Sequence, residues 1–569
     1  MAETNPVTGD DAAPWLKSYP ADIKWEFEAQ HRPVFDLLDD AVARFADRPC
    51  TDFMDRKTTY GEMGAMTQRL AAGLQSIGIG PGTKVGLFFP NCPYYIAAYH
   101  AVLKCGAVVV NYNPLYAERE LAHQIDDSET EVMITLDLKV LHDKLVPLVG
   151  KTKLKTIIVA SMAKALPFPK SWLFPIVKRA DVAKIPSDAV HKRLDDLLLD
   201  EGAFKPVDID PHQTAVLQYT GGTTGVPKGA MLSHSNLYNN AVQSALWFNK
   251  CKPGQERGLV VLPFFHVFAM TAIMNFCLYY GAEMILVPRF ELEPVLKIID
   301  KKKPTIFPAV PTIYMAVANF KDLSRYSIDS INYCISGGAP LPLEVRNAFI
   351  KVTGCQLVEG YGLTEAAPVT ACNPIGGVNK EGSIGLPIPG TSVEVVSLND
   401  PSQPVPQGEK GELCFRGPQI MQGYHNKPEA TADVLTDGRL RTADVGYLDE
   451  DGYIFIVDRI KDIIIAGGYN IYPRMVEEGI YLHPAIAECI VAGIPDEYRG
   501  ETVKAFIKLA EGQSLTAEEL TDFLKDKLAP MEMPKEIEFR DELPKTMIGK
   551  LDRKAVREEE LAKRTSNAA

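Results

Sequence analysis

Apolar runs alternate with helix-patterned stretches through residues 1 to about 210 of the chain. Residues 84–89 (KVGLFF) form an apolar run that a Pro-Asn pair ends, residues 94–104 carry helical spacing, and residues 107–111 form the next strand-like run. A strand, a helix and a second strand in this order place the two strands parallel in one sheet. We therefore predict an α/β domain whose parallel sheet is covered by helices on both faces.

Two later apolar stretches are turned by prolines, residues 261–270 (VLPFFHVFAM) and residues 307–317 (FPAVPTIYMAV). Their composition suits the walls of an apolar pocket. His266 is the lone polar side chain of the first stretch. A histidine in such a setting is more often a hydrogen-bonded core residue than a catalyst, so the pattern alone gives it no role.

Residues 258–282 contain no Asp, Glu, Lys or Arg and are long enough to span a bilayer. Pro263, His266 and Asn275 interrupt the stretch, and its first residues are β-like. We therefore predict a buried strand, a turn and a core helix rather than a membrane span.

The last third of the chain predicts a second, smaller domain. Residues 411–418 (GELCFRGP) and 437–462 resemble short hairpins, because glycines and acidic turns separate their strand-like runs. From residue 460 onward the pattern is that of a small α+β unit. Its elements are expected at residues 488–494 (ECIVAGI), 503–509 (VKAFIKL) and 517–527. The predicted domains are residues 1–459 and 460–569.

Residues 162–179 (MAKALPFPKSWLFPIVKR) break the strand and helix rhythm. Three prolines forbid one continuous helix. Aromatic side chains lie beside lysines and an arginine, a combination that suits a membrane–water interface. A partner-binding loop and an ordinary packed excursion remain open alternatives.

Composition bounds the class of protein. A chain of 569 residues, 46% hydrophobic and 23% charged, predicts a globular protein of two or more domains. A formal charge of −13 argues against a general nucleic-acid binder. The ten cysteines form no CxxC pair and the ten histidines no HExxH motif, so neither a zinc site nor a disulfide framework is expected. The N-terminus has no apolar signal segment, which favours a reducing, cytoplasmic location.

The densest chemical motif is residues 219–229 (YTGGTTGVPKG), which follow a strand-like run. Glycines let backbone N–H groups crowd around an anion, threonines add hydroxyl donors, and Lys228 adds charge. A P-loop would need Gly-Lys-Ser/Thr leading into a helix, whereas here Pro227 precedes the lysine and β-like residues follow. We predict a strand–loop–strand phosphate cradle; a Gly/Thr-rich surface turn is the alternative.

Two glycine loops, residues 336–341 (SGGAPL) and 359–365 (EGYGLTE), each follow a β-rich run. Ligands of α/β proteins bind at the carboxyl ends of parallel strands, where a glycine-lined wall admits a flat base and Tyr361 can stack on it. Thr364 and Glu365 offer a phosphate donor and an oxygen ligand for Mg²⁺. The alternative is a pair of surface turns with an exposed glutamate.

Three further side chains carry weaker signals. Asp444 and Arg459 would suit a ribose, since one accepts hydroxyl protons and the other donates. A turn aspartate and an exposed arginine would look the same in sequence. Lys550 follows a glycine in a polar tail segment, and by itself it has only the default expectation of a surface lysine.

Taken in order, eight segments between residues 210 and 554 resemble the adenylate-forming superfamily. They are YTGGTTGVPKG, LPFFHVF, SGGAPL, EGYGLTE, GELCFRGP, RTADVG, DRIKD and PKTMIGK. Residues 437–462 resemble the signature of fatty acyl-CoA synthetases, and the chain looks most like the bacterial long-chain ones. The resemblance implies a large multi-sheet N-terminal domain, a layered α/β structure with a β-barrel-like subdomain, and a small mobile α+β C-terminal domain.

The resemblance also implies roles for individual residues. Lys550, Thr220, Glu365 and His266 would be catalytic, with Thr220 and Glu365 at Mg²⁺. Lys461 would be the hinge. CoA would contact Gly467, Gly468 and Tyr469. ATP or AMP would contact Tyr219, Thr220, Gly221, Gly222, Thr223, Thr224, Gly225, Lys228, Gly338, Ala339, Pro340, Glu359, Gly360, Tyr361, Gly362, Thr364, Asp444, Val457, Arg459 and Lys550.

One position departs from the superfamily pattern. Ala443 stands where relatives usually have glycine before the ribose aspartate, and a methyl group there crowds the turn if φ is positive.

The implied reaction activates a long-chain fatty acid with ATP and transfers the acyl group to CoA. Expected partners are the fatty acid, ATP, CoA and Mg²⁺, with no nucleic acid; a homodimer and contact of residues 162–179 with the inner face of the membrane stay open. Competing interpretations are an enzyme for a medium-chain or aryl acid, an acyl-AMP ligase feeding a carrier protein, and a catalytically silent ATP-binding regulator.

Overall fold

The computed structural model describes residues 13–220, 227–466, 469–496, 499–546 and 550–567. One part of it is built on a seven-stranded sheet in the order β7-β6-β5-β3-β4-β8-β9. All neighbours in this sheet are parallel except β8 and β9. The strands are β3 (Lys84–Phe88), β4 (Val108–Asn111), β5 (Val132–Leu136), β6 (Thr156–Ala160), β7 (His191–Arg193), β8 (Thr214–Thr220) and β9 (Lys228–Ser233).

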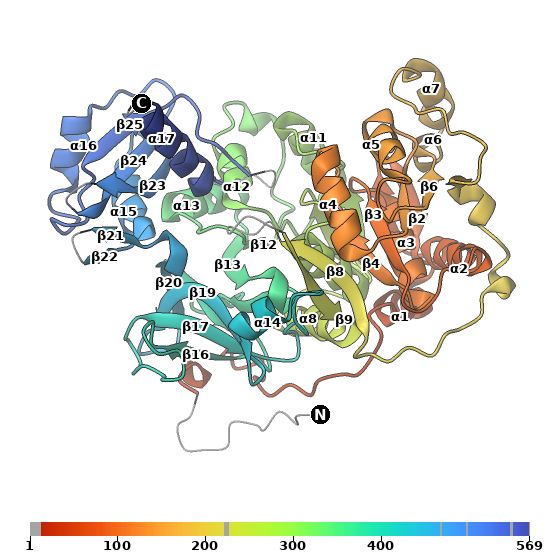
Figure 1. Cartoon of the computed structure of the whole chain (residues 1–569), viewed down its shortest axis with the longest axis horizontal. Coiled ribbons are helices and arrows are strands. Elements are labelled where there is room, and N and C mark those ends of the chain that lie inside the picture. Colours follow the sequence, from red (N-terminus) through yellow and green to blue (C-terminus); the bar gives the residue numbers. More distant parts are fainter. Residues whose placement is uncertain (1–12, 221–226, 467–468, 497–498, 547–549, 568–569) are drawn as a thin grey trace.

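The predicted β-α-β rhythm is confirmed in this sheet. Helix α3 (Pro93–Lys104) connects β3 to β4, and all of its residues except Lys104 are buried. A helix that is apolar all round belongs inside a core rather than on its surface. Helices α1 (Asp36–Phe45), α2 (Tyr60–Ser76), α4 (Glu118–Ser128) and α5 (Lys139–Leu145) complete this part of the molecule, seen in red and orange in Figure 1.

The uncharged stretch at residues 258–282 folds as a strand, a turn and a broken helix, as expected. It contains β10 (Arg257–Val260), α9 (Val267–Ala269), a π-helix (Met270–Asn275) and α10 (Phe276–Tyr280). Strand β10 joins β11 (Glu283–Leu286), β1 (Pro49–Phe53) and β2 (Arg56–Thr59) in a four-stranded sheet. Among the described residues no helix is both long and apolar enough to cross a membrane.

A nine-stranded sheet forms the middle of the molecule. Strands β12 (Tyr333–Ser336) and β13 (Gln356–Gly362) are parallel, and the strands that follow are antiparallel, which confirms the hairpins expected there. The remaining strands are β14 (Val369–Cys372), β15 (Ser383–Pro387), β16 (Ser392–Val396), β17 (Gly411–Arg416), β18 (Leu435–Thr436), β19 (Arg439–Leu448) and β20 (Ile454–Arg459). Nearby helices are α8 (His234–Trp247), α11 (Leu292–Lys302), α12 (Pro311–Ala318), α13 (Leu343–Thr353) and α14 (Pro428–Val434).

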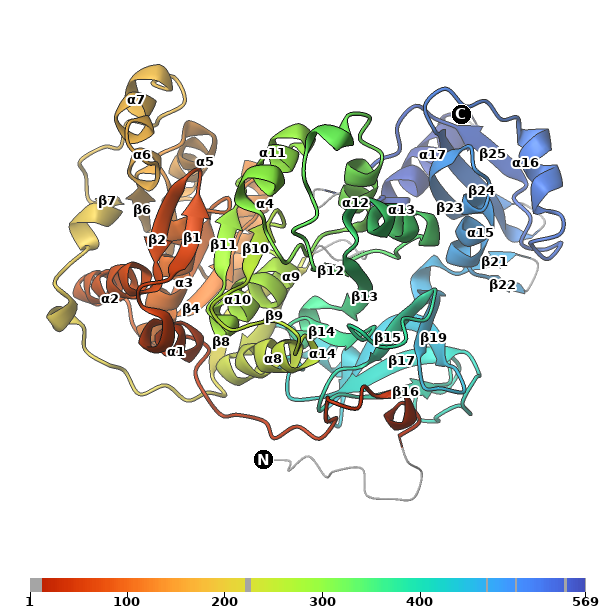
Figure 2. The ribbon, with the colours of Figure 1, turned by 180° about the vertical axis from the view of Figure 1, so that it is seen from behind.

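The N-terminal segment returns to this middle sheet. The indole N–H of Trp25 donates to the carbonyl of Thr391 (2.9 Å), and the Tyr19 hydroxyl donates to the carbonyl of Pro387 (2.7 Å). Figure 2 shows the segment passing from α1 along the lower edge of the molecule to the neighbourhood of β16. Residues far apart in sequence are thereby tied into one body.

The chain after residue 460 forms an α+β unit with hydrophobic cores of its own. The large cluster of buried residues extends to Ile454, whereas separate clusters begin at Ile464 and Ile490. The sheet of this unit comprises β21 (Ile464–Ala466), β22 (Tyr469–Ile471), β23 (Ile486–Asp496), β24 (Gly500–Leu509) and β25 (Glu536–Phe539). Its helices are α15 (Pro473–Tyr481), α16 (Ala517–Leu524) and α17 (Arg553–Asn567).

Residues 162–179 form a projection that we call the α6–α7 projection. It contains two short helices, α6 (Met162–Ala165) and α7 (Lys170–Val177), so the prolines do prevent one continuous helix. Figures 1 and 2 both show α7 at the outer end of the molecule, away from the C-terminal unit. Apolar side chains are exposed here: Phe168 (84%), Trp172 (66%), Leu173 (41%), Ile176 (60%) and Val177 (73%). Phe174 instead packs against the core.

Candidate active site

The expected phosphate cradle lies between β8 and β9, which pair antiparallel with Thr220 opposite Lys228. The expected strand on each side of the loop is therefore confirmed. Five of the residues assigned to phosphate lie outside the described residues: Gly221, Gly222, Thr223, Thr224 and Gly225.

A tyrosine connects the cradle to the expected metal ligand. The ammonium group of Lys228 lies 5.1 Å from the ring centre of Tyr424, and the Tyr424 hydroxyl donates to Oε1 of Glu365 (2.6 Å). On the other side of the cradle, the Tyr219 hydroxyl donates to Oδ2 of Asp127 (2.6 Å). Lys228 and Glu365, which are far apart in sequence, thus both contact Tyr424.

The two glycine segments lie at the same edge of the middle sheet, because β12 and β13 are parallel. The second was expected as a loop from residue 359, but β13 continues to Gly362, since its residues 360–362 pair with β14. Gly338 has a φ of +82°, and a Cβ there would lie only 2.8 Å from Cε of Lys550. Glycine is therefore required at position 338 for two reasons, the positive φ of its backbone and the close approach of Lys550. Ala339 and Pro340 follow at the partly exposed rim.

The second glycine segment places an aromatic ring beside the expected ribose residues. Tyr361 on β13 donates its hydroxyl proton to Oδ2 of Asp444, and Nε of Arg459 donates to Oδ1 of the same carboxylate (3.0 Å). Asp444 on β19 and Arg459 on β20 are direct cross-strand partners. Strand register brings this pair together, which is the arrangement that the ribose assignment requires.

Ala443 has a φ of +58°, the left-handed conformation in which a methyl group is strained. Its N–H donates to Oε1 of Glu412 (3.0 Å), and the backbone N–H of Asp444 donates to Oγ1 of Thr442 (3.0 Å). These two bonds hold the turn in spite of the methyl group, so the Asp444 carboxylate still points to the Tyr361 hydroxyl.

Lys550 lies close to Arg459 and His266. Burial, followed by the neighbouring Arg459 guanidinium, lowers the pKa of Lys550 to about 8. Burial, followed by the Lys550 charge, lowers the pKa of His266 to about 3. Nδ1 of His266 accepts a hydrogen bond from the N–H of Phe268 (3.3 Å). The site therefore presents a neutral imidazole and a lysine that is still largely cationic at neutral pH.

Other assigned residues of the β13 region are more enclosed. Burial raises the pKa of Glu359 to about 7 against the opposing effect of Arg474, a residue of α15. A Cβ on Gly360 would meet the Ile335 side chain at 2.7 Å, and one on Gly362 would meet the carbonyl oxygen of Pro368 at 2.2 Å. Thr364 and Glu365 open a short 3-10 turn, while Val457 on β20 is buried.

The assigned hinge, Lys461, and one assigned CoA residue, Tyr469, lie at the start of the C-terminal unit. Lys461 is the central residue of a 3-10 turn (Ile460–Asp462) between the two sets of cores, and burial lowers its pKa. Tyr469 on the edge strand β22 is 57% exposed. Gly467 and Gly468 lie outside the described residues.

An apolar cavity lies between α8 and the middle sheet. Its lining comes from α8, the π-helix region and the middle sheet, with Ser244 as its one hydroxyl: Ser244, Trp247, Phe248, Ala272, Phe276, Ile306, Pro308, Ile335, Val369, Cys372 and Ile388. Of the two proline-turned stretches, residues 307–317 contribute Pro308 to this lining, whereas residues 261–270 contribute none.

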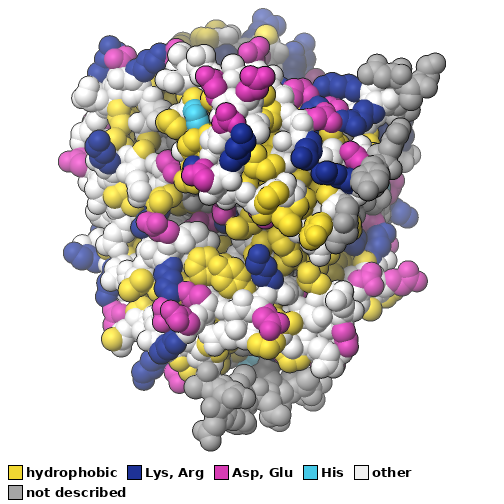
Figure 3. Space-filling model, turned by 90° about the vertical axis from the view of Figure 1, so that its left-hand side faces the viewer, with side chains coloured by type: hydrophobic (Ala, Val, Ile, Leu, Met, Phe, Trp, Pro, Cys, Tyr) yellow, Lys and Arg dark blue, Asp and Glu magenta, His cyan; other side chains and the backbone are white. Residues whose placement is uncertain are grey.

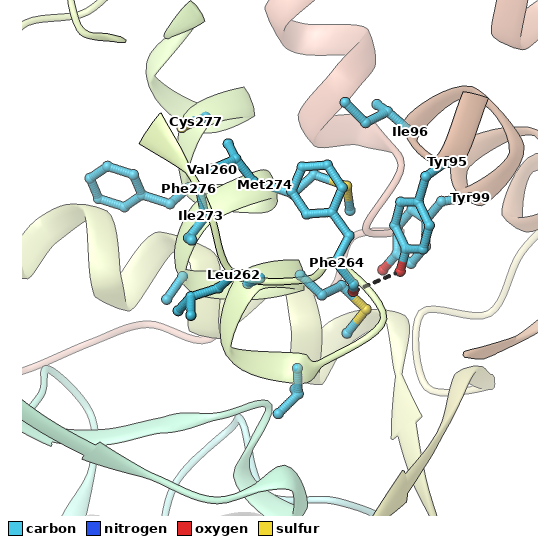
Figure 4. Close-up of a cluster of buried hydrophobic side chains, with 14 of the residues drawn as sticks. Tyr95, Ile96, Tyr99, Val260, Leu262, Phe264, Ile273, Met274, Phe276 and Cys277 are labelled. Atoms are coloured by element: carbon cyan, nitrogen blue, oxygen red, sulfur yellow. Dashed lines mark hydrogen bonds between the residues drawn. The ribbon is translucent and has the colours of Figure 1, made fainter. Parts of the chain in front are cut away.

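The loop that carries His266 is anchored in a buried cluster. Figure 4 shows Tyr95 and Phe264 pointing toward each other, and the Tyr95 hydroxyl donates to the carbonyl oxygen of Phe264 (2.9 Å). The same hydroxyl lies 2.8 Å from Oδ1 of Asn111, and Asn111 donates to Gln218 on β8 (2.9 Å). These bonds connect the His266 loop to the strand that leads into the phosphate cradle.

Two site residues were missed by the sequence reasoning, Tyr424 and Asp127. Tyr424 enters through an isolated antiparallel bridge to Ala230, a contact between segments almost two hundred positions apart. Asp127 belongs to α4, a helix for which the sequence analysis made no prediction. Neither residue lies in a motif, so local spacing offers no signal for them.

The donor set around Glu365 bears on metal binding. Within the described residues, no three or more His, Cys, Asp or Glu side chains gather as metal ligands. Mg²⁺ commonly uses one or two protein oxygens together with phosphate oxygens and water. Glu365 and Thr220 fit that kind of site and do not fit a metal held by protein side chains alone.

Comparisons with known proteins agree along almost the whole chain. The model of a family described as "AMP-binding enzyme" matches residues 38–425, and that of the "AMP-binding enzyme C-terminal domain" matches residues 475–550. A long-chain-fatty-acid–CoA ligase of Bacillus subtilis is 47% identical over 552 residues, which cover 96% of this chain and 98% of that protein. The protein of the same description from Escherichia coli O6:H1 is 36% identical over 557 residues, with coverages of 96% and 98%.

A solved structure shares the fold. ATP-bound MatB from Rhodopseudomonas palustris superposes with a TM-score of 0.81 at 27% identity, covering 93% of this chain and 99% of its own. The α/β architecture with a large N-terminal part and a small C-terminal part is thus common to both chains.

Proposed function

Because this chain belongs to the family of AMP-binding enzymes, we propose that it is a long-chain fatty acid–CoA ligase that forms AMP. The enzyme uses ATP to convert a fatty acid to acyl-AMP, with release of pyrophosphate. It then transfers the acyl group to CoA and releases AMP. The observation that carries this proposal is the meeting of Lys550 from the C-terminal unit with Gly338 at the edge of the middle sheet, close to Asp444 and Arg459.

In the first step, a carboxylate oxygen of the fatty acid attacks the α-phosphorus of ATP, and the bond to pyrophosphate breaks. A carboxylate and a triphosphate repel each other, so the site must supply positive charge where negative charge develops. We assign that role to Lys550, with Lys228 and the cradle residues at the β- and γ-phosphates. Because Nδ1 of the neutral His266 imidazole accepts the N–H of Phe268, its proton is on Nε2 and can be donated to the substrate carboxylate.

The nucleoside is assigned to the residues around Tyr361. The Asp444 carboxylate, fixed by Tyr361 and Arg459, accepts the ribose hydroxyl protons. The glycine edge at Gly338 and Ala339, together with Pro340, Gly360 and the Tyr361 ring, frames the adenine. Thr364 donates to the α-phosphate. These roles are inferred from position and chemistry.

A magnesium ion fits beside the phosphates. Glu365 and Thr220 would hold it, since Tyr424 orients the Glu365 carboxylate toward the cradle. When bound, the ion supplies charge neutralisation on the phosphate oxygens.

In the second step, the thiol sulfur of CoA attacks the acyl carbon of acyl-AMP, and the bond to the AMP oxygen breaks. The second step does not need Lys550, which at this point still lies beside Gly338. We propose that residues 460–569 form a mobile domain that turns about Lys461 between the two steps and brings Gly467, Gly468 and Tyr469 to CoA. Closure of a domain over a reaction site also excludes water from the reactive acyl-AMP.

The acyl chain is assigned to the apolar region between α8 and the middle sheet, where a cavity of about 20 Å³ must widen to accept a long chain. The cavity lining is aromatic and aliphatic apart from Ser244, and each buried methylene contributes about 0.8 kcal/mol. This chemistry favours long aliphatic acids over short or charged ones.

The α6–α7 projection is assigned to a membrane surface, the phase in which long-chain fatty acids are dissolved. Its apolar side chains are exposed beside Lys170 and Lys178. By contrast, the face of the molecule in Figure 3 mixes Lys and Arg with Asp and Glu, and no single-sign basic surface suited to nucleic acid covers it.

An isotope experiment tests the proposed chemistry. Palmitate carrying ¹⁸O in its carboxyl group is incubated with ATP, CoA, Mg²⁺ and the purified protein, and the AMP is analysed by mass spectrometry. Attack of the carboxylate on the α-phosphorus leaves one carboxyl oxygen in AMP, so the AMP must contain ¹⁸O. Label in inorganic phosphate together with ADP would contradict the proposal. Lys550→Ala is the control, because this variant should form little labelled AMP.

A further inference from the structure

Asp458 is a buried carboxylate at the junction of the two units. It lies on β20, three positions before Lys461, and is 4% exposed. Successive residues of a strand point to opposite faces. Arg459 points to Asp444 at the ribose site, whereas the Asp458 side chain points to the C-terminal unit.

The carboxylate of Asp458 binds the start of helix α15. Its Oδ2 accepts the backbone N–H of Arg474 (2.7 Å), the second residue of that helix. The first N–H groups of a helix have no partner within the helix, and its dipole favours an anion there. A strand of the large N-terminal part therefore caps a helix of the C-terminal unit.

Arg553 makes the second connection. Its Nη1 lies 3.4 Å from Oδ1 of Asp458 and 3.0 Å from Oδ2 of Asp462, and its Nη2 lies 2.8 Å from Oε1 of Glu477. Arg553 begins α17, three positions after Lys550. One guanidinium thus connects the segment that carries Lys550 to carboxylates on both sides of Lys461.

These three carboxylates differ in one respect. Asp462 and Glu477 follow Lys461 in the chain and belong with Arg553 to the C-terminal unit. Asp458 precedes Lys461 and belongs to the middle sheet. A turn of the C-terminal unit about Lys461 leaves the bonds of Arg553 to Asp462 and Glu477 intact. It must break the bonds of Asp458 to Arg474 and Arg553.

We propose that Asp458 is a positioning residue that latches the C-terminal unit in the arrangement where Lys550 reaches the α-phosphate. This inference rests on the proposed function, because it assigns the described arrangement to the adenylation step. The latch must open before CoA can react. Asp458 contacts none of the three substrates in this scheme and acts through Arg474 and Arg553.

The test separates the two half-reactions. Asp458→Asn keeps the shape of the side chain but removes its charge, and it should slow pyrophosphate release about ten-fold or more, since hydrogen bonds to charged groups are the stronger ones. Formation of acyl-CoA from supplied acyl-AMP should be unchanged or faster. Glu477→Gln is the matched control, because it removes another carboxylate partner of Arg553 within one unit and should change both half-reactions by the same factor.

A second readout does not depend on activity. Trypsin cleavage after Lys461, identified by mass spectrometry, should be faster in Asp458→Asn than in the natural protein or in Glu477→Gln, because the opened unit exposes the turn. If Asp458→Asn does not fold, Arg553→Lys tests the same contact, since an ammonium group cannot bridge these carboxylates as a guanidinium does. Equal loss of both half-reactions, or unchanged cleavage, would overturn the latch. A natural protein that makes no pyrophosphate from any fatty acid would instead overturn the proposed function.

Discussion

The α6–α7 projection offers a direct test of how the enzyme meets an insoluble substrate. Trp172 and Ile176 lie one helical turn apart on α7 and are 66% and 60% exposed. Residues four apart lie on one face of a helix, so both side chains can enter a bilayer together. We expect Trp172→Gln combined with Ile176→Gln to weaken binding to vesicles while leaving the fold intact, because neither side chain is buried.

The magnitude follows from the exposed area. An aromatic side chain offers about 150–250 Å², so this pair presents roughly 250 Å² at its observed exposure. Complete burial at about 25 cal/mol per Å² would contribute about 6 kcal/mol, and half burial at an interface about 3 kcal/mol. A loss of about 3 kcal/mol weakens vesicle partitioning about a hundred-fold.

Flotation of the protein with vesicles measures this partitioning, and activity on palmitate dissolved in the vesicles measures its consequence. Lys170 and Lys178 should make binding stronger with anionic lipid, since their ion pairs with Asp55 and Asp181 are exposed and weak. Leu482→Gln removes an equally exposed apolar side chain from the C-terminal unit and is the matched control. If the double variant floats and turns over vesicle palmitate as well as the control does, the projection is not a membrane contact.

Three further outcomes are expected. Lys550→Ala should slow pyrophosphate release about a hundred-fold or more while sparing thioester formation from supplied acyl-AMP. Lys461→Pro fixes φ at the hinge, so it should slow thioester formation and spare pyrophosphate release. Equal loss of both half-reactions in both folded variants would contradict the two roles. The pyrophosphate-forming rate should fall as pH rises through about 8, because Lys550 loses its proton there, whereas a rate that keeps rising would refute this role. Ala443→Gly should stabilise the protein by about 0.5–1 kcal/mol by relieving a positive φ, and a lower Tm would refute the strain.

Local patterns were sufficient for much of the fold. The apolar run at β3, the helical spacing of α3 and the run at β4 were predicted almost to the residue, since each pattern is set by burial within one element. The uncharged stretch at residues 258–282 was also assigned correctly as buried, although the π-helix within it has no signature in its spacing. The C-terminal end of α16 was predicted three residues beyond its observed end at Leu524, because helix ends depend on caps more than on periodicity.

The site was predictable only where its residues lie in motifs. Asp444 and Arg459 were identified separately, but their pairing depends on the register between β19 and β20. Tyr424, Asp458 and Arg553 act through contacts between distant segments, so no local spacing marks them. Phe174 differs from its apolar neighbours on the projection, because it is partly buried against the core, and the sequence pattern does not separate it from them.

The central claim is that this enzyme activates long-chain fatty acids and transfers them to CoA. CoA-dependent AMP formation across saturated acids from hexanoate to palmitate, with benzoate alongside, measures it directly. Apparent affinity should climb with chain length, because each further methylene removed from water adds about 0.8 kcal/mol, until the chain outgrows the apolar region that binds it. A flat response along the series, or a preference for benzoate, would contradict it.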